Sequence, residues 1–305
     1  MTSAIVTVPP YAPFIREVAR HSIVSGLRLN TVMPVKESID DVLKRLQDDA
    51  DGKPVYIDLK GRQLRTVTYG VPPFTEIRIS HPISVKTPVT AYFGNGRESA
   101  TVVGVDGNKL LFLEGPQRVV GPGESVNIID STLVIQGYLT KKDLAYVEAA
   151  SKVGMHDYML SFVESEADLA QLRSHDKGAN IVAKIESMKG MKYVREDYKT
   201  NCRLMAARGD LYIEVGRPHE ILDAVDKIIE KDPDAIAASR ILASMATSAE
   251  PSCTDISDVA YLMKTGYKTL MLGDEVCLRR ESVMGALNLL EAIVESYDKE
   301  PVIAK

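Results

Sequence analysis

The sequence predicts an α/β fold, a closed (β/α)8 TIM barrel with a small antiparallel β-barrel domain inserted after its third strand. Short apolar runs rich in strand-forming residues recur along the chain, and helical patterns follow most of them. Near-continuous apolar runs are typical of parallel strands that are buried on both faces. One central interval lacks helical periodicity and carries hairpin signals instead. An open doubly wound sheet is the alternative arrangement of the same elements.

The apolar runs predict eight barrel strands separated by helices. One helix is expected over 36–49, where Ile39, Val42 and Leu46 recur at the spacing of a single helical face. Another is expected to begin after Thr140, an N-cap residue that has Asp143 three positions further on. Further helices are expected over 11–21, 254–266 and 280–297. The predicted strands cover residues 4–8, 26–30, 54–59, 157–163, 180–186, 203–211, 234–241 and 269–275.

The interval 67–137 breaks this alternation of strands and helices. Short strand-like runs such as TEIRIS and TPVTAYF are separated there by GNG, DGN and GPG, which favour hairpins and tight turns. We therefore expect residues 1–66 and 138–305 to form the barrel and 67–137 to form an inserted β-barrel lid domain. An insertion after the third strand lies over the carboxyl ends of the barrel strands, where it can cover a site.

Composition and charge exclude several classes of function. The net charge is −5 and the pI about 5.7, so no nucleic-acid partner is expected. No apolar run reaches the roughly 18–20 residues of a membrane span, and no signal peptide is recognisable at the amino terminus. The cysteines, Cys202, Cys253 and Cys277, are widely spaced, which is typical of a reducing compartment. We therefore expect a cytoplasmic protein without a membrane partner.

Charged and polar side chains gather at the predicted strand ends, where a TIM barrel carries its function. Residues two apart in a strand point to the same face, so these side chains are expected to share the barrel rim. Glu186 and Asp210 are hard oxygen donors that suit Mg²⁺ or Mn²⁺, and Lys184 with Arg28 could neutralise a carboxylate or phosphoryl group. A ring of structural ion pairs is the alternative. The residues two apart that are expected to share a strand face are Arg28 and Asn30, Asp58 and Lys60, Lys184 and Glu186, and Arg208 and Asp210. Ser161, Ser239, Asp274 and Glu275 lie at the ends of further predicted strands.

The segments around these strand ends resemble the pyruvate kinase family in chain order. They are GLRLN (26–30), YIDLKGRQLRT (56–66), LTKKDL (139–144), MLSFVESEADLAQLR (159–173), IVAKIESMKGM (181–191), LMAARGDLYIEV (204–215), AASRILASM (237–245) and PSCTDISDVAYLMKTGYKTLMLGDE (251–275). The resemblance covers nearly the whole chain, including the inserted β domain. Lyases that act on enolpyruvate have similar strand ends, so the ordered set is more specific than any one segment.

The resemblance implies a role for each matching residue. Glu186 and Asp210 would hold the divalent cation, Mg²⁺ or Mn²⁺, and Lys184 would stabilise the enolate and the transferring phosphoryl group. Arg28 and Arg65 would contact phosphate. Ser239 stands where the family has a threonine that helps to protonate the enolate. The substrate-binding set further includes the backbone of Ala207, Arg208 and Gly209, together with Asn30 and Asp58.

The sequence also departs from the family pattern. Val32 and Leu59 replace the two hydroxyl residues of the family's potassium site, so we do not expect potassium activation. VPPYAP replaces the family's Gly-Pro-Ala-Ser turn near the nucleotide, which leaves the use of ADP or ATP open. The chain ends soon after the eighth helix, so no counterpart of the family's carboxy-terminal regulatory domain is expected.

Two enzymatic readings and one non-enzymatic reading follow. The leading expectation is a divalent-metal-dependent phosphotransferase of pyruvate-kinase type that acts on phosphoenolpyruvate, pyruvate or a related 2-oxo acid, with a specialised acceptor as a variant. The alternative is a metal-dependent lyase, an aldolase or decarboxylase, that uses the same metal-bound enolate. A non-catalytic regulatory protein is the third reading, which retention of the charged rim residues disfavours. Apolar outer faces of the barrel helices lead us to expect a homo-oligomer.

Overall fold

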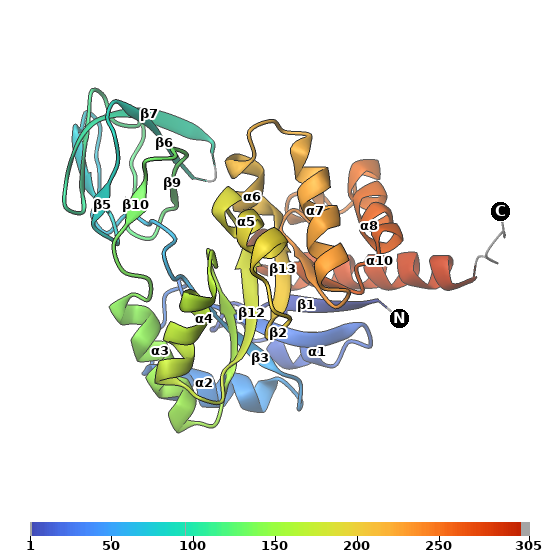
Figure 1. Cartoon of the computed structure of the whole chain (residues 1–305). Helices are drawn as coiled ribbons and strands as arrows, with labels where there is room; N and C mark the ends of the chain where they lie inside the picture. The colour runs from blue at the N-terminus through green and yellow to red at the C-terminus, as the bar shows by residue number, and fades with distance from the viewer. Residues whose placement is uncertain (1, 95, 300–305) are drawn as a thin grey trace.

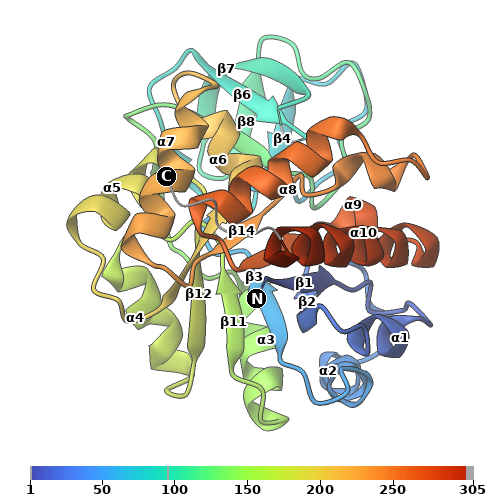
Figure 2. The ribbon, with the colours of Figure 1, turned by 90° about the vertical axis from the view of Figure 1, so that its right-hand side faces the viewer.

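The computed structural model, which describes residues 2–94 and 96–299, contains a closed barrel of eight parallel strands surrounded by helices (Figure 1, Figure 2). Neighbouring strands follow the order β1-β2-β3-β11-β12-β13-β14-β15, and β15 pairs with β1 to close the barrel. The predicted (β/α)8 fold is confirmed and the open sheet is excluded. The strands are β1 (Ser3–Thr7), β2 (Val24–Asn30), β3 (Val55–Leu59), β11 (Asp157–Leu160), β12 (Asn180–Ile185), β13 (Arg203–Ala207), β14 (Ile236–Ala238) and β15 (Thr269–Leu272).

The helices pack their apolar sides against the barrel. The Thr140 side chain and the Asp143 side chain form the predicted capping box at the start of α3. The helix predicted over 11–21 is shorter, because Pro13 disfavours helical backbone at the residue before it. The helices are α1 (Ile15–Ala19), α2 (Ile39–Asp49), α3 (Lys141–Lys152), α4 (Glu166–His175), α5 (Met188–Glu196), α6 (Arg208–Glu214), α7 (Glu220–Lys231), the 3-10 turn η1 (Ala243–Ala246), α8 (Cys253–Thr265), α9 (Asp274–Cys277) and α10 (Arg280–Lys299).

Several predicted strands end earlier than expected, which changes where some side chains point. Strand β13 ends at Ala207, and Arg208 and Asp210 lie on the first turn of α6. The prediction that these two residues share one strand face is therefore wrong, because helical residues two apart diverge around the axis. Asp274 and Glu275 likewise begin α9 instead of ending β15.

The insertion is antiparallel, as predicted, and carries its own core. It forms a five-stranded sheet in the order β4-β8-β7-β6-β9 and a two-stranded pair β10-β5, rather than one closed barrel. Its apolar cluster, which includes Leu64, Phe93 and Phe112, is separate from the cluster between the barrel strands and the helices. Figure 1 shows the insertion at one end of the barrel. Its strands are β4 (Glu76–Arg78), β5 (Ile83–Ser84), β6 (Val89–Phe93), β7 (Glu98–Asp106), β8 (Lys109–Phe112), β9 (Val126–Ile128) and β10 (Val134–Ile135).

The parallel registers bring the polar strand ends to one rim. Asn30 pairs in register with Asp58 across β2 and β3, and Lys184 lies one position before the end of β12. A search of residues 2–94 and 96–299 finds no helix with the length and apolar character needed to cross a membrane.

Candidate active site

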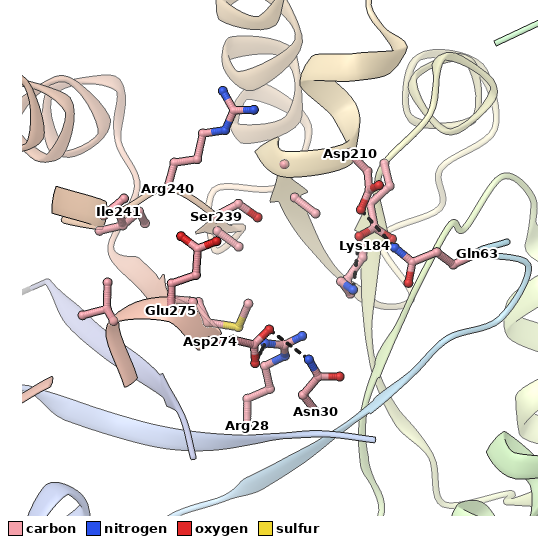
Figure 3. Close-up of a pocket in the computed structure, with 18 of the residues that line it drawn as sticks. Arg28, Asn30, Gln63, Lys184, Asp210, Ser239, Arg240, Ile241, Asp274 and Glu275 are labelled. Carbon is pink, nitrogen blue, oxygen red and sulfur yellow. Dashed lines mark hydrogen bonds and ion pairs between the residues drawn. The ribbon is translucent and has the colours of Figure 1, made fainter. Parts of the chain in front are cut away.

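A cavity of about 440 Å³ opens at the carboxyl ends of the barrel strands. It is lined by barrel residues, several of which are labelled in Figure 3. Arg97 of the insertion also lines it. Most of the predicted site residues meet here, namely Arg28, Asn30, Arg65, Lys184, Glu186, Ala207, Gly209, Asp210 and Ser239. Asp58 lies buried beneath them, and Arg208 does not line the cavity.

Asp58 is the fully buried carboxylate that holds the cations of this rim in place. Its Oδ2 accepts from the Arg28 Nε at 2.8 Å and from the Lys60 Nζ at 3.0 Å, and the Arg28 Nη2 forms a further short contact. Its Oδ1 faces the Lys184 Nζ at 3.2 Å. Burial alone would raise the pKa of Asp58, but these three cations outweigh burial and hold the pKa well below its ordinary value. Asp58 therefore positions three cations and does not itself line the cavity, and its predicted role in substrate binding stays a prediction.

Lys184 and Glu186, two apart at the end of β12, form a buried pair. The Lys184 Nζ lies 3.1 Å from the Glu186 Oε1 and donates to the Ser161 Oγ at 2.7 Å. Burial lowers the pKa of Lys184, but the carboxylates of Asp58 and Glu186 outweigh burial, so the pKa stands above its ordinary value. The ammonium charge thus persists at neutral pH. Ion pairing between rim residues, the alternative considered for these side chains, is thus present among residues that line the cavity.

Glu186 lies close enough to a second carboxylate for the two to repel each other. Its Oε2 accepts from the backbone N–H of Phe162 at 2.8 Å. Burial raises the pKa of the Glu186 carboxyl, Lys184 lowers it, and Asp210 raises it again, with a net upward shift. Two neighbouring carboxylates that face one cavity favour a bound cation.

Asp210 is held by two side-chain amides from different parts of the chain. The Gln63 Nε2 donates to its Oδ2 and the Asn127 Nδ2 donates to its Oδ1, both at 3.1 Å. Asn127 belongs to β9 of the insertion, so the insertion contacts this carboxylate directly. The Oδ1 of Asn127 is buried and has no hydrogen-bond partner among the described residues. The position of Asp210 therefore depends on how the insertion sits on the barrel.

Two further cations line the cavity and differ in their partners. The Arg65 guanidinium donates to the Gln63 Oε1 through Nε at 3.0 Å and Nη2 at 2.6 Å, and to the Gly123 carbonyl. In residues 2–94 and 96–299 no carboxylate forms a salt bridge with Arg65. Burial is the main reason that the pKa of Arg65 is lowered. Burial, together with the charges of Lys184 and Arg65, lowers the pKa of Lys60 to about 7, although Asp58 opposes the shift.

The turn after β14 presents Ser239 to the cavity in a strained backbone conformation. Ser239 and Arg240 have φ angles of 72° and 63°, in the left-handed region that L-residues with side chains rarely adopt. The Arg208 Nη2 donates to the Ser239 carbonyl at 2.9 Å, and both Arg208 Nη atoms contact the Asp258 carboxylate at 2.7 Å. The predicted substrate-binding residue Arg208 thus directs its side chain away from the cavity, because it lies on α6, and supports the turn.

The donor set fits a divalent cation that takes part of its coordination from a ligand. Mg²⁺ is commonly held by one or two carboxylates, with waters and substrate oxygens completing its shell. Glu186 and Asp210 both line the cavity and supply such carboxylates. No cluster of three or more acidic, histidine or cysteine ligands occurs in the described part of the chain.

Several cavity residues were not predicted as site residues from sequence. Lys60, Asp274 and Glu275 were recognised at strand ends, but no role was assigned to them. The patterns of single elements could not identify Gln63, Arg97 and Arg240, which reach the cavity only through loops and the insertion. The Asn30 Nδ2 donates to the Asp274 Oδ2 at 2.9 Å, so Asp274 orients a predicted residue.

Comparison with known proteins adds independent information. The sequence model of the family described as "Pyruvate kinase, barrel domain" matches residues 82–279. Pyruvate kinase of Borreliella burgdorferi is 24% identical, over 90% of this chain and 63% of that protein. Pyruvate kinase of Agrobacterium vitis is 30% identical, over 63% of this chain and 45% of that protein. Pyruvate kinase 1 of Saccharomyces cerevisiae is 25% identical, over 85% of this chain and 59% of that protein. The chain therefore spans less than two thirds of the length of these relatives.

Proposed function

Because the chain belongs to the pyruvate kinase family, we propose that it is a divalent-metal-dependent phosphotransferase that acts on phosphoenolpyruvate, pyruvate or a related 2-oxo acid. The observation that carries this proposal is the meeting of Lys184, Glu186 and Asp210 in one cavity with Arg65. Within residues 2–94 and 96–299 Arg65 forms no salt bridge, and it shares the cavity with the Glu186 and Asp210 carboxylates, of which Glu186 also pairs with Lys184. This combination suits a ligand that is both anionic and metal-chelating.

The metal and the lysine have complementary tasks in this proposal. Glu186 and Asp210 would hold Mg²⁺ or Mn²⁺, which when bound would neutralise the carboxylate and enolate oxygens of the substrate. Lys184 keeps its proton at neutral pH, because Asp58 and Glu186 favour the charged form. Its ammonium is therefore fixed where negative charge develops as the phosphorus–enolate oxygen bond breaks.

The phosphoryl group is assigned to the arginines. Arg65 keeps its guanidinium oriented through Gln63 and Gly123, neither of which neutralises its charge. Arg28 contributes positive potential, although it also serves Asp58 and Asp274 through ion pairs. Since phosphoryl transfer depends mainly on positioning and on neutralising charge, this arrangement suits the transfer.

Protonation of the enolate carbon is assigned to Ser239. Its side chain lines the cavity, and the Arg208–Asp258 pair holds its backbone carbonyl. A hydroxyl held there could pass a proton from solvent to the enolate once phosphorus has bonded to the acceptor oxygen.

Thermal unfolding with an enolate mimic tests the proposal. Mg²⁺ or Mn²⁺ together with oxalate should raise the melting temperature, because a ligand that binds only the folded state stabilises it by mass action. A melting temperature unchanged by every combination of metal and oxalate would contradict the proposal. A further rise with ADP or ATP supports the kinase, whereas no effect of nucleotide favours the lyase alternative.

Phosphorus NMR then addresses the acceptor. The protein is incubated with phosphoenolpyruvate, Mg²⁺ and either ADP or a panel of other acceptors, and a new phosphorus resonance identifies the phosphorylated product. Loss of phosphoenolpyruvate without any acceptor, accompanied by carbon–carbon cleavage products, identifies a lyase instead. A cytoplasmic location and homo-oligomeric assembly stay predictions, as does potassium independence.

A further inference from the structure

Arg240 lines the active-site cavity but is left without a charged partner. Its guanidinium carbon lies 4.4 Å from the centroid of the Tyr212 ring. Across residues 2–94 and 96–299 it forms no salt bridge with a carboxylate, and no hydrogen bond involves its side chain. In Figure 3 Arg240 and Glu275 lie on one side of Ser239, with Lys184 and Asp210 on the other. The cavity therefore has a second charged end.

The other cations of the cavity are already engaged. Arg28, Lys60 and Lys184 share the Asp58 carboxylate. Arg97 of the insertion pairs with Glu275 at 3.3 Å. Arg65 forms no salt bridge with a carboxylate of the described residues, but it is assigned to the transferring phosphoryl group. Arg240 is thus a positive charge of the cavity to which the proposed phosphoryl transfer assigns no role.

The backbone under Arg240 is held in a costly conformation. Ser239, Arg240 and Leu242 all have positive φ angles, and residues with side chains persist there only when surrounding contacts enforce the shape. Arg208 and Asp258 supply such contacts through the Ser239 carbonyl. Strain of this kind is characteristic of ligand-binding turns.

The Tyr212 contact prepares Arg240 for an anion. An aromatic ring under the guanidinium engages its face and leaves the N–H donors at its edge free. Free N–H donors in a fork bind carboxylate or phosphate through two parallel hydrogen bonds. The cavity volume of about 440 Å³ lies within the roughly 300–1,000 Å³ that accommodates ligands much larger than a three-carbon acid.

We propose that Arg240 binds an anionic group, carboxylate or phosphate, of the substrate that exchanges the phosphoryl group with the enolate. In this substrate the anionic group is distinct from the oxygen that exchanges the phosphoryl group, and that oxygen would lie nearer Lys184. The Arg97–Glu275 pair borders the same end, so the insertion helps to complete this subsite. The inference deepens the proposed function, because it assumes that the Lys184 end binds the metal and the enolate.

Calorimetric titration tests the subsite with defined probes. The wild-type protein is first saturated with Mg²⁺ and oxalate, and inorganic phosphate, succinate and ADP are then titrated separately. At least one of these anions should bind. Arg240→Gln should weaken that binding about tenfold or more, while the Kd for oxalate with Mg²⁺ stays within about twofold. Preference for phosphate or for succinate distinguishes the two chemical sources of the anion.

Matched variants separate this effect from a general loss of charge or of folding. Arg217→Gln removes an exposed arginine outside the cavity and should leave every affinity unchanged. Tyr212→Leu keeps the charge but removes the ring, and should weaken anion binding less than Arg240→Gln does. Unfolding without ligand establishes that each variant is folded.

The outcomes distinguish this inference from the proposed function. If oxalate with Mg²⁺ does not bind the wild-type protein, the proposed function fails. If oxalate binds but no second anion does, or if Arg240→Gln binds the second anion as tightly as the wild type, the subsite is wrong. If Arg240→Gln weakens oxalate binding as much as it weakens binding of the second anion, the subsite is also wrong, because Arg240 would then affect both anions alike.

Discussion

Asp58 is a buried residue that positions the cations of the cavity without lining the cavity itself. It is fully buried and binds Arg28, Lys60 and Lys184 together. Removing one member of a buried ion cluster leaves an uncompensated charge, which typically costs about 3–5 kcal/mol. The arrangement therefore fixes the positions of these cations in the absence of any ligand.

Glu186→Gln should abolish stabilisation by the metal. The substitution keeps the side-chain shape but replaces an anionic metal ligand by a neutral amide. The wild type at 100 times the Kd for Mg²⁺ gains about 2.7 kcal/mol of unfolding free energy, and the variant should gain almost none, as measured by denaturant unfolding. Glu148→Gln, an exposed site on α3, serves as the control. A metal response that survives unchanged in Glu186→Gln rules out the metal assignment.

Lys60 should make oxalate binding depend on pH near neutrality. Its pKa of about 7 means that the ammonium is charged below pH 7 and loses its proton as the pH rises. The affinity for anionic oxalate at saturating Mg²⁺ should therefore fall above pH 7, by up to about tenfold per pH unit. Titrations between about pH 6 and 9 measure this dependence.

Lys60→Met supplies the control for that pH dependence. It cannot titrate, so its oxalate affinity should be weaker at pH 6 and nearly flat across the same range. The same decline with pH in wild type and variant would show that another group titrates.

At the scale of elements, the transition from β13 to α6 determines the direction of the side chains that follow it. Asp210 enters the cavity, whereas Arg208 turns outward to Asp258. Strand β9 of the insertion then reaches across to Asp210 through Asn127. Elements from both domains thus position one carboxylate.

Asn127→Ala should weaken the metal site without removing a ligand. Partners that orient metal ligands typically contribute about 10–100-fold to metal affinity, and the Asn127 Nδ2 orients the Asp210 Oδ1. Calorimetric titration with Mn²⁺ should show a loss in that range. Asn108→Ala changes an asparagine of the same insertion that hydrogen-bonds the Ile79 carbonyl instead, and should keep the wild-type affinity. Equal Mn²⁺ affinities in Asn127→Ala and the wild type would refute the positioning role.

At the scale of the whole molecule, the apolar cluster of the insertion is separate from the two apolar clusters of the barrel. One barrel cluster includes Tyr138, and the insertion's cluster includes Leu64. The segments that flank the insertion approach each other, because a Cβ on Gly61 would meet the Tyr138 ring at 2.8 Å. The boundaries at 66/67 and 137/138 remain a prediction that excision of the insertion can test.

Replacing 67–137 by a short Gly–Ser linker should leave a barrel that unfolds cooperatively, because the barrel keeps its own core. The shortened chain also carries Leu64→Ser, because the Leu64 side chain packs in the apolar cluster of the insertion and would otherwise be exposed. Circular dichroism and denaturant unfolding measure the fold. The stabilisation by Mg²⁺ and oxalate should shrink, because Asn127 is gone. Aggregation or gradual, non-cooperative unfolding of the excised chain would show that the two parts do not fold independently.

The sequence by itself determined the features that depend on local spacing. Lys184 and Glu186 were expected on one face because strand side chains alternate, and the (β/α)8 barrel was expected because apolar runs alternate with helical patterns. The pairing of Thr140 with Asp143 is equally local. The two residue pairs are separated by only two or three positions, whereas the barrel was predicted from the order of strands and helices along the chain, with an open sheet as the alternative.

Only the tertiary structure decided which distant segments meet. Gln63 and Asn127 hold Asp210 from different domains, and Arg240 enters the cavity through a strained turn. The outward direction of Arg208 followed from one strand ending four residues early, where α6 begins. Contacts between remote residues depend on the closure of the barrel and the docking of the insertion, and periodicity within a single element carries no information about either.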